Sequence, residues 1–274
     1  MTESQSESQS TGVAGAGRNR VAVVTGARRG IGRRIAETLA AEGHDLALID
    51  VAAADETERA VKAAGRQVVS LVGDVSREAD VTSLARRVHD SFGRVDVLVN
   101  NAGINLITPT EDLTGEDWNR VLGVNLTGTF LCSREFGRRM LERRHGSIVN
   151  ISSLLGLQGA PDRASYAVSK HGVVGLTRSL AVEWGARGVR VNAVCPGYVN
   201  TDMNATNQAR GFYTAEDITE RSPMGRFAEP EDVAQAVAFL ADERRSGYVN
   251  GTALSVDGGW TADASWRGLL LSKR

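Results

Sequence analysis

Seven short runs of apolar, mostly β-branched residues recur along the chain, and longer segments with helical spacing separate them. The runs cover residues 21–24, 46–50, 68–72, 95–100, 147–152, 189–194 and 253–256. The clearest helical segments are 32–43, 80–93, 164–184 and 231–242. Parallel strands need crossover connections, usually helices, and strands covered on both faces are apolar throughout. The pattern therefore predicts a doubly wound α/β fold with a seven-stranded parallel sheet and helices on both of its faces.

Two stretches fall outside this alternation. Residues 1–18 are rich in Ser, Gln, Glu and Gly and contain no apolar run, so we predict a disordered tail rather than a secretory signal. Residues 201–225 are polar and too long for an ordinary connection. We expect a substrate lid there, because long insertions after a strand often cover a site, with a flexible surface excursion as the alternative. Residues 19–274 show no linker-like break and are expected to form a single domain.

The amino-acid composition limits the kinds of molecule that we expect the protein to bind. The 32 Lys and Arg residues nearly balance the 33 Asp and Glu residues, which gives no electrostatic reason to expect nucleic acid or an anionic membrane. No segment approaches the roughly 18 apolar residues of a membrane span. Cys132 and Cys195 have no paired spacing, and the four histidines are scattered, so we expect no metal site and a reduced, cytoplasmic setting. A small molecule is the expected partner.

The first apolar run is followed by TGARRGIG at residues 25–32. Gly26 permits a tight turn, Gly30 allows close approach to a pyrophosphate, and Gly32 lets the next helix pack on the sheet. The free N–H groups at that helix N-terminus favour phosphate. The glycine spacing departs from G-x-G-x-x-G, and an ordinary turn is the alternative. The loop predicts a dinucleotide site only together with further residues.

Asp50 supplies the second observation. It ends the second apolar run, 18 positions after Gly32, and a carboxylate about 20 residues beyond such a loop can accept hydrogen bonds from ribose hydroxyls. The same carboxylate repels a 2′-phosphate. We therefore expect NAD as the preferred cofactor, with Arg28 and Arg29 as exposed loop charge.

Candidate chemistry lies in the segment 164–184. Tyr166 and Lys170 are four positions apart and share a helix face. A nearby ammonium lowers the pKa of a phenol from about 10 toward neutrality, and such a tyrosine can exchange a proton with an alcohol. Ser153 follows the run 147–152 and can hydrogen-bond a substrate oxygen at the same sheet edge. Without Ser153, the simpler interpretation of Tyr166 and Lys170 would be two residues on an exposed helix face with no catalytic role.

These motifs together resemble the short-chain dehydrogenases/reductases of the single-domain kind. The resemblance covers roughly residues 18–260 and rests on TGARRGIG, Asp50, Asp74, NNAG at 100–103, Asn125, Ser153, Tyr166, Lys170 and PGYVNT at 196–201. It implies a Rossmann-like dinucleotide-binding catalytic domain that oxidises or reduces at a CH–OH group. No catalytic position departs from the family pattern.

The resemblance also implies roles for individual residues. Tyr166 would be the general acid/base, Lys170 would lower its pKa and hold the nicotinamide ribose, and Asn125, within a helix, would support a proton relay. Ser153 would orient the substrate. The cofactor-binding residues implied are Gly26, Arg28, Arg29, Gly30, Ile31, Gly32, Asp50, Asp74, Val75, Asn101, Ala102, Gly103, Tyr166, Lys170, Pro196, Gly197, Val199 and Thr201. In relatives that prefer NADP, a basic residue at the position of Arg29 can serve the extra phosphate, so dual use stays open.

Substrate binding is expected at Ser153, Gln158, Tyr166 and Tyr198. The surrounding lining is expected to include Asn105, Leu155, Asp162, Asn204, Asn207, Arg210 and Tyr213. This polar lining favours a small hydroxylated substrate, and the region 196–234 is similar to polyol and sugar dehydrogenases of the family. One alternative is a 3-oxoacyl-thioester reductase, in which Arg163 or Arg210 would meet an acidic carrier. Another is a catalytically silent dinucleotide-binding regulator, which the intact catalytic residues argue against.

The resemblance finally implies a homotetramer formed through the helix that bears Tyr166 and through the last strand. Trp260, Trp266 and residues 269–271 give the C-terminus an apolar character. Packing against a neighbouring subunit would bury these side chains. Packing on the chain's own domain is the alternative.

Overall fold

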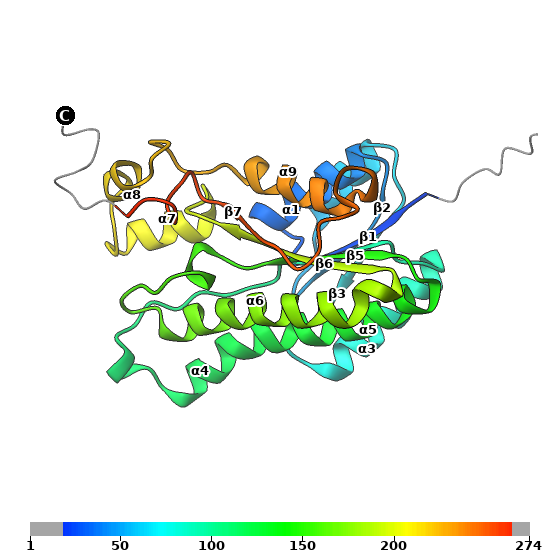
Figure 1. Ribbon diagram of the computed structural model, residues 1–274, viewed down its shortest axis with the longest axis horizontal. Coiled ribbons are helices and arrows are strands. Elements are labelled where there is room, and N and C mark those ends of the chain that lie inside the picture. The colour runs from blue at the N-terminus through cyan, green and yellow to red at the C-terminus, as the bar shows by residue number, and fades with distance from the viewer. Residues whose placement is uncertain (1–18, 265–274) are drawn as a thin grey trace, which may run out of the picture.

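The computed structural model describes residues 19–264, and its centre is one parallel sheet in the order β3-β2-β1-β4-β5-β6-β7 (Figure 1). The strands are β1 Val21–Thr25, β2 Asp45–Asp50, β3 Val68–Val72, β4 Val97–Asn100, β5 Gly146–Ile151, β6 Val189–Pro196 and β7 Ala253–Val256. All seven predicted runs form strands. Their pairing is parallel throughout, which confirms the predicted sheet.

Helices cover both faces of the sheet. They are α1 Gly30–Ala41, α2 Asp55–Ala63, α3 Glu78–Phe92, α4 Gly115–Leu122, α5 Gly128–Arg143, α6 Ala164–Trp184, α7 Asp202–Ala209, α8 Ala215–Arg221, α9 Pro230–Ala241 and α10 Glu243–Ser246. In Figure 1, α1 and α9 lie above the sheet, and α3, α5 and α6 lie below it. The doubly wound fold is confirmed.

Alternation along the strands builds the two halves of the core. In β1, Ala22 and Val24 belong to the apolar cluster that also contains residues of α1 and α9, whereas Val23 belongs to the cluster on the side of α3 and α5. All three side chains are fully buried. A strand with apolar residues on both faces can be stable only where both faces are covered, so the continuous run VAVV requires this three-layer arrangement.

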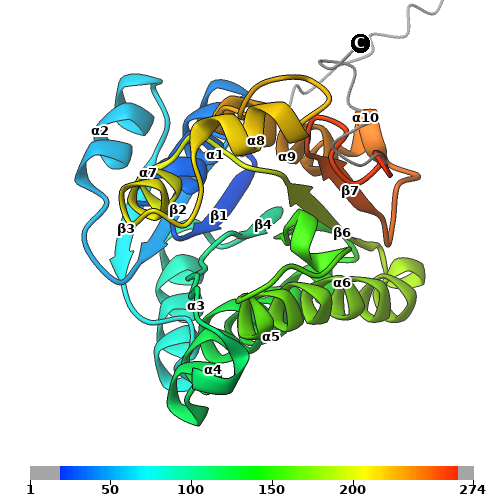
Figure 2. The same ribbon diagram turned by 90° about the vertical axis from the view of Figure 1, so that its left-hand side faces the viewer.

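The strand order reverses direction between β1 and β4, and such a switch point leaves a crevice beyond the carboxyl ends of the strands. The segment after β6 folds into α7 and α8, which lie at this end of the sheet in both views (Figure 2). The polar insertion predicted at 201–225 thus contains two short helices placed near the crevice. Whether it closes over the site as a lid stays a prediction.

Candidate active site

A cavity of about 440 Å³ opens at the carboxyl ends of the strands, within the size range of sites for small molecules and cofactors. Its lining brings together most of the predicted residues. They are Gly26, Arg28, Arg29, Gly30, Ile31, Gly32, Asp50, Asp74, Val75, Asn101, Ala102, Gly103, Ser153, Tyr166, Lys170, Pro196, Gly197, Tyr198, Val199 and Thr201. Of the predicted catalytic, cofactor-binding and substrate-binding residues, Asn125 and Gln158 are outside this lining within residues 19–264, as are Asp162, Arg210 and Tyr213 of the wider predicted lining.

The loop between β1 and α1 has the geometry that a pyrophosphate needs. Gly26 and Gly30 have positive φ values of +64° and +56°, which side chains rarely adopt. A Cβ on Gly32 would lie 2.0 Å from the Gly26 carbonyl oxygen, so the helix can start here only with glycine. The first turn of α1 carries no side-chain cap and no acidic residue. Its N–H groups and dipole therefore remain available to phosphate, and this end of the cavity fits a dinucleotide.

Asn101 holds this loop in place from β4. Its side-chain amide donates hydrogen bonds to the carbonyl oxygens of Thr25, at 2.9 Å, and Gly26, at 3.0 Å. The Thr25 hydroxyl in turn accepts from the backbone N–H groups of Asn101 and Ala102, both at 3.0 Å. The Asn101 side chain thus supports the shape of the glycine loop, a role that the sequence pattern does not reveal.

Asp50 and Arg29, the two charged residues expected to influence the choice between NAD and NADP, both interact with other residues of the protein. The Asp50 carboxylate accepts a hydrogen bond of 3.0 Å from the backbone N–H of Arg28. The Arg29 guanidinium lies 3.5 Å from the Asp202 carboxylate, and both side chains are largely exposed. Asp50 therefore lies beside the glycine loop with a second oxygen that can accept from a ribose hydroxyl, while a carboxylate neutralises Arg29.

Asp74 and Val75 follow β3 at the same edge of the cavity. One Asp74 carboxylate oxygen accepts from the backbone N–H of Ser76, at 2.9 Å, and from the Ser76 hydroxyl, at 2.7 Å. The Asp74 N–H donates to the Asp80 carboxylate at 3.1 Å. These bonds fix the turn after β3, and Val75 is buried against the core.

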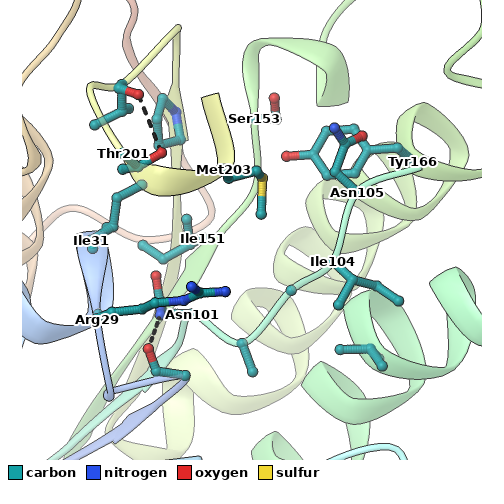
Figure 3. Close-up of a pocket in the computed structure, with 18 of the residues that line it drawn as sticks. Arg29, Ile31, Asn101, Ile104, Asn105, Ile151, Ser153, Tyr166, Thr201 and Met203 are labelled. Atoms are coloured by element: carbon teal, nitrogen blue, oxygen red, sulfur yellow. Dashed lines mark hydrogen bonds between the residues drawn. The ribbon is translucent and has the colours of Figure 1, made fainter. Parts of the chain in front are cut away.

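Tyr166 and Ser153 face one another across the far end of the cavity. Tyr166 lies in the first turn of α6, and Ser153 follows β5; Figure 3 shows both side chains turned toward the same space. The helix that bears Tyr166 spans Ala164–Trp184, as the pattern predicts. The Ser153 hydroxyl also accepts from the Leu155 N–H at 3.1 Å, which orients it. Two hydroxyl groups are thereby available to one substrate oxygen.

Lys170 lies one turn further along α6 and is almost completely buried. Its ammonium donates a hydrogen bond of 2.8 Å to the Ile151 carbonyl and lies 5.7 Å from the centre of the Tyr166 ring. Burial lowers the pKa of Lys170 to about 8, because a cation loses its hydration there.

The direction expected for the Tyr166 pKa is wrong for the protein without a bound cofactor. Burial raises the pKa of Tyr166, and hydrogen bonding with Ser153 and the charge of Arg163 lower it only in part. Sequence spacing places Lys170 beside the tyrosine but does not reveal how strongly burial penalises a phenolate. The predicted closeness of Tyr166 and Lys170 is confirmed, but the pKa of Tyr166 is raised rather than lowered.

Asn125 occupies a π-helical turn, Gly123–Thr127, between α4 and α5 rather than an ordinary helix. Its side-chain oxygen accepts from the Ile104 N–H at 2.8 Å, and its amide donates to the Ile104 carbonyl and the Ser169 hydroxyl, both at 3.0 Å. π-turns often occur at functional sites. Here the extra residue turns the asparagine inward, where it joins the loop after β4 to the helix that bears Tyr166 and Lys170.

The substrate end of the cavity is only partly as predicted. Asn105, Leu155, Asn204 and Asn207 line it, as expected. Gln158, Asp162, Arg210 and Tyr213 are outside the lining within the described part of the chain. The Tyr213 hydroxyl instead donates a hydrogen bond of 2.6 Å to the side-chain oxygen of Asn204, which does line the cavity.

Met203 also lines the cavity, although the sequence motifs do not predict it. Figure 3 shows its side chain between the nucleotide end and the hydroxyl pair. Its position right after the PGYVNT run was the only available signal. Asn105 lines the same cavity as Tyr166, and its side-chain oxygen is buried without a hydrogen-bond partner in the described structure. A buried polar atom of this kind favours a polar ligand group nearby.

The Tyr198 ring forms the wall behind the substrate end. It lies 5.4 Å from the Tyr213 ring centre in an edge-to-face arrangement and 5.0 Å from the Trp260 ring centre. Trp260 is thus packed on its own domain. Trp266 and residues 269–271 lie outside the described residues.

Two kinds of site are absent from residues 19–264. This part of the chain contains no group of three or more side chains suited to holding a metal ion. None of its helices combines the length and apolar character needed to cross a membrane. The class of the site follows from its lining instead: a glycine loop suited to a dinucleotide shares one cavity with Ser153, Tyr166 and Lys170, as in a dinucleotide-dependent oxidoreductase.

Comparison with known proteins agrees with that class. The family described as enoyl-(acyl carrier protein) reductase matches residues 26–261. The chain is 45% identical, over 89% of its length and 97% of the relative, to cis-4-hydroxycyclohexanecarboxylate dehydrogenase from Sinomonas cyclohexanicum. It is 41% identical, over 89% and 95%, to 2-dehydro-3-deoxy-D-gluconate 5-dehydrogenase from Bacillus subtilis. The chain belongs to the short-chain dehydrogenase/reductase family and is an oxidoreductase that acts on CH–OH groups.

Two further similarities bear on the alternatives. A 3-oxoacyl-[acyl-carrier-protein] reductase from Synechocystis is 40% identical over 87% of this chain and 96% of its own. A crystal structure from Beutenbergia cavernae, with NADP bound at low occupancy, is 44% identical, with a TM-score of 0.84 over 89% of this chain and 97% of that one. The family thus uses NAD(P), and its members differ in substrate.

Proposed function

We propose that the protein transfers a hydride between NAD(H) and a small secondary alcohol or its ketone, with Tyr166 as the general acid/base. One observation carries the assignment: the hydroxyls of Tyr166 and Ser153 and the ammonium of Lys170 belong to the same cavity as the glycine loop of α1. The dinucleotide, when bound, supplies or accepts the hydride at its nicotinamide ring. Protein groups perform the proton transfer and the positioning.

The roles follow from the positions of these groups. Ser153 holds the substrate oxygen by a hydrogen bond, and Tyr166 takes the proton of an alcohol or gives one to a ketone. The Lys170 cation stabilises the phenolate by charge, since it lies one helical turn away. Asn125 positions this pair through Ser169 and Ile104 and carries the proposed relay toward Lys170.

Asp50 supports a preference for NAD over NADP. Its carboxylate borders the cavity at the end of β2, where it would accept from a free ribose hydroxyl and repel a 2′-phosphate. Arg29, the residue that would favour NADP, is paired with Asp202. Dual use remains the second option, because both members of that pair are exposed.

The lining supports a small polar substrate such as a polyol or a sugar derivative. Asn105, Asn204, Asn207 and Tyr198 offer hydrogen-bonding groups at the substrate end. The competing function is reduction of 3-oxoacyl thioesters, which the Synechocystis relative favours. Both reactions use the same Ser153 and Tyr166, so the difference lies in what the cavity admits.

We also propose a homotetramer in the cytoplasm. Val168 and Val182 on α6 are 46% and 84% exposed, and β7 is an edge strand of the sheet formed by the described residues. Within residues 19–264, the helix and strand of the expected interface thus both offer surface for a neighbouring subunit. Both cysteines are buried thiols rather than a disulfide, which suits a reducing compartment. Light scattering on the purified protein tests the assembly, and a monomer would contradict it.

Turnover with a substrate panel tests the proposed function. Polyols, sugars, 4-hydroxycyclohexanecarboxylate and acetoacetyl thioesters are compared with NAD(H) and NADP(H), and absorbance of the reduced cofactor is followed. We expect the highest kcat/KM for a small alcohol or ketone. Best activity with a thioester would support the competing reductase. Dinucleotide binding in calorimetry without turnover of any substrate would instead indicate a silent regulator.

A further inference from the structure

Arg163 is an unpaired cation in the wall of the catalytic cavity. It is the N-cap residue of α6, three positions before Tyr166, and it lines the cavity. Within residues 19–264 its guanidinium forms no ion pair, whereas Arg29, at the nucleotide end of the same cavity, is paired with Asp202. Its side chain does not cap the helix either. Among the described residues, neither an ion pair nor helix capping accounts for the position of this charge.

The backbone before Arg163 is held in an unusual conformation. Asp162 has a φ of +58°, one of two non-glycine residues with positive φ in the described chain. Its carbonyl accepts a hydrogen bond of 3.0 Å from the N–H of Thr108, in the loop after β4. Side chains in this region of φ cost free energy, and they persist where the surroundings enforce them, often at functional sites. The turn fixes the start of α6, and with it the direction of Arg163.

The charges along the cavity are separated. The carboxylates that line it within residues 19–264 are Asp50, Asp74 and Asp202, all in the loops of the nucleotide end or beside Arg29. At the substrate end the charged groups of the lining are Arg163 and the buried Lys170. A substrate that enters there meets positive charge and hydrogen-bond donors, with no carboxylate opposite. Such a wall favours an anion.

We propose that Arg163 binds a carboxylate of the substrate, so that the enzyme acts on hydroxy acids and oxo acids whose carboxylate is remote from the reacting carbon. The proposal rests on the proposed function, since Tyr166 and Ser153 must hold the reacting oxygen. Arg163 lines the same cavity as Tyr166 from the N-cap position of α6, and a guanidinium can hold a carboxylate with two parallel hydrogen bonds. The substrate would then be gripped at both ends.

The electrostatics agree with this placement. The charge of Arg163 lowers the pKa values of Tyr166, Tyr198 and Tyr213, against the raising effect of burial. One cation thus acts on all three phenols around the substrate end. A bound carboxylate would offset that charge, and a neutral substrate would leave it unpaired.

The test compares a carboxylate with a neutral isostere of equal size. Reduction of 4-oxocyclohexanecarboxylate and of 4-oxocyclohexanecarboxamide is measured in the wild type and in the Arg163→Gln, Arg163→Lys and Arg87→Gln variants. Arg87 is an exposed arginine on α3, outside the cavity lining, and controls for loss of one positive charge. The ratio of kcat/KM for acid over amide is the readout.

We expect the wild-type ratio to exceed that of Arg163→Gln by about 10- to 100-fold, the size of a hydrogen-bonded charge contact, mostly through KM. Arg163→Lys should retain part of the preference, and Arg87→Gln should match the wild type. An equal loss on acid and amide in Arg163→Gln would overturn the proposal, because it would indicate a structural role. A wild-type ratio near one would overturn it as well.

Two outcomes separate this proposal from the proposed function. Reduction of the amide with no preference for the acid leaves the hydride-transfer assignment intact and removes the carboxylate site. Reduction of neither compound, nor of any alcohol or ketone in the panel, counts against both. If Arg163→Gln impairs only an acetoacetyl thioester on a carrier protein, and not its small-thioester analogue, Arg163 recognises an acidic carrier instead and the proposal fails.

Discussion

The Lys170 ammonium lies 5.7 Å from the centre of the Tyr166 ring and at the same time donates a hydrogen bond of 2.8 Å to the Ile151 carbonyl. Both side chains are held by α6, so their separation is fixed by one helical turn. Burial raises the pKa of Tyr166 and lowers that of Lys170 to about 8. Desolvation favours the neutral form of each group, whereas the charge of Arg163 lowers the pKa of Tyr166 and the charge of Cys195 raises that of Lys170. The pair is therefore sensitive to any charge that enters the cavity.

Removal of the Tyr166 hydroxyl should abolish proton transfer and leave cofactor binding intact. Tyr166→Phe keeps the ring that packs in the first turn of α6, and we expect kcat to fall on the order of 10²- to 10⁴-fold, the usual contribution of general acid/base catalysis. Calorimetric titration with NAD should give a nearly unchanged Kd. Tyr248→Phe, at a fully exposed tyrosine, is the matched control. Turnover of Tyr166→Phe at the wild-type rate would exclude the assignment.

Burial of Lys170 should make the protein's stability depend on pH in a defined window. Its pKa is about 8 in the folded protein and 10.5 ordinarily, so the unfolded chain binds more protons between these values and folding becomes more favourable as pH rises. The free-energy cost of burying the charged Lys170 ammonium lowers stability fully below pH 8 and no longer contributes above pH 10.5. Lys170→Met removes it. Relative to this variant, the wild type should gain up to about 3 kcal/mol in free energy of unfolding across that window.

Denaturant unfolding of both proteins at a series of pH values measures this difference, and subtraction removes the contributions of titrating groups that do not interact with Lys170. Cys195, whose pKa the Lys170 charge lowers, is replaced by serine in both proteins. A difference that stays constant from pH 8 to 10.5 would show that Lys170 has an ordinary pKa in the folded protein. Lys170→Met should also weaken cofactor binding, because it removes the proposed contact with the nicotinamide ribose.

Local patterns in the sequence were sufficient to predict the sheet and the helix that bears Tyr166 and Lys170. The apolar run VAVV and the spacing of Tyr166 and Lys170 depend on neighbours in sequence, and both appear in the structure as predicted. The glycine loop is equally local, because Gly26 and Gly32 are required by backbone geometry within a few residues.

Features that depend on distant packing could not be predicted in this way. The π-turn at Asn125 adds one residue to a helix and leaves the apolar period nearly unchanged. Met203 and Arg163 enter the cavity because of how α7 and α6 lie across the sheet edge. The raised pKa of Tyr166 reflects burial by residues from several elements. Sequence spacing carries no measure of any of these effects.

A methyl group on Gly32 should prevent the glycine loop from forming. The Cβ of Gly32→Ala would lie 2.0 Å from the Gly26 carbonyl oxygen and 2.4 Å from the Asn101 side chain, so the loop and its tie to β4 must move. We expect a loss of several kcal/mol, on the order of the cost of overpacking a core, and loss of NAD binding. Gly115→Ala is the control, since no atom lies within 4 Å of its Cβ. Equal melting temperatures for both variants would contradict the geometry.

Charge at position 50 should decide between the two dinucleotides. Asp50→Asn keeps an oxygen that can accept the Arg28 N–H and removes the negative charge that would repel a 2′-phosphate. We expect kcat/KM with NADP to rise, and with NAD to fall, by about 10-fold each, the scale of one charge-assisted contact. Asp202→Asn alone should change little, because Asp50 still repels the phosphate.

The double variant Asp50→Asn/Asp202→Asn also releases Arg29 from its carboxylate partner. A free guanidinium beside Gly30 can then attract the extra phosphate, so the NADP preference should exceed that of Asp50→Asn. Steady-state kinetics with both cofactors in all four proteins form a double-mutant cycle that measures how strongly positions 50 and 202 are coupled in the choice of cofactor. An unchanged NAD-to-NADP ratio in Asp50→Asn would show that this carboxylate does not select the cofactor. If Asp202→Asn left the ratio unchanged in both the wild-type and the Asp50→Asn background, the pairing of Arg29 with Asp202 would have no influence on the choice.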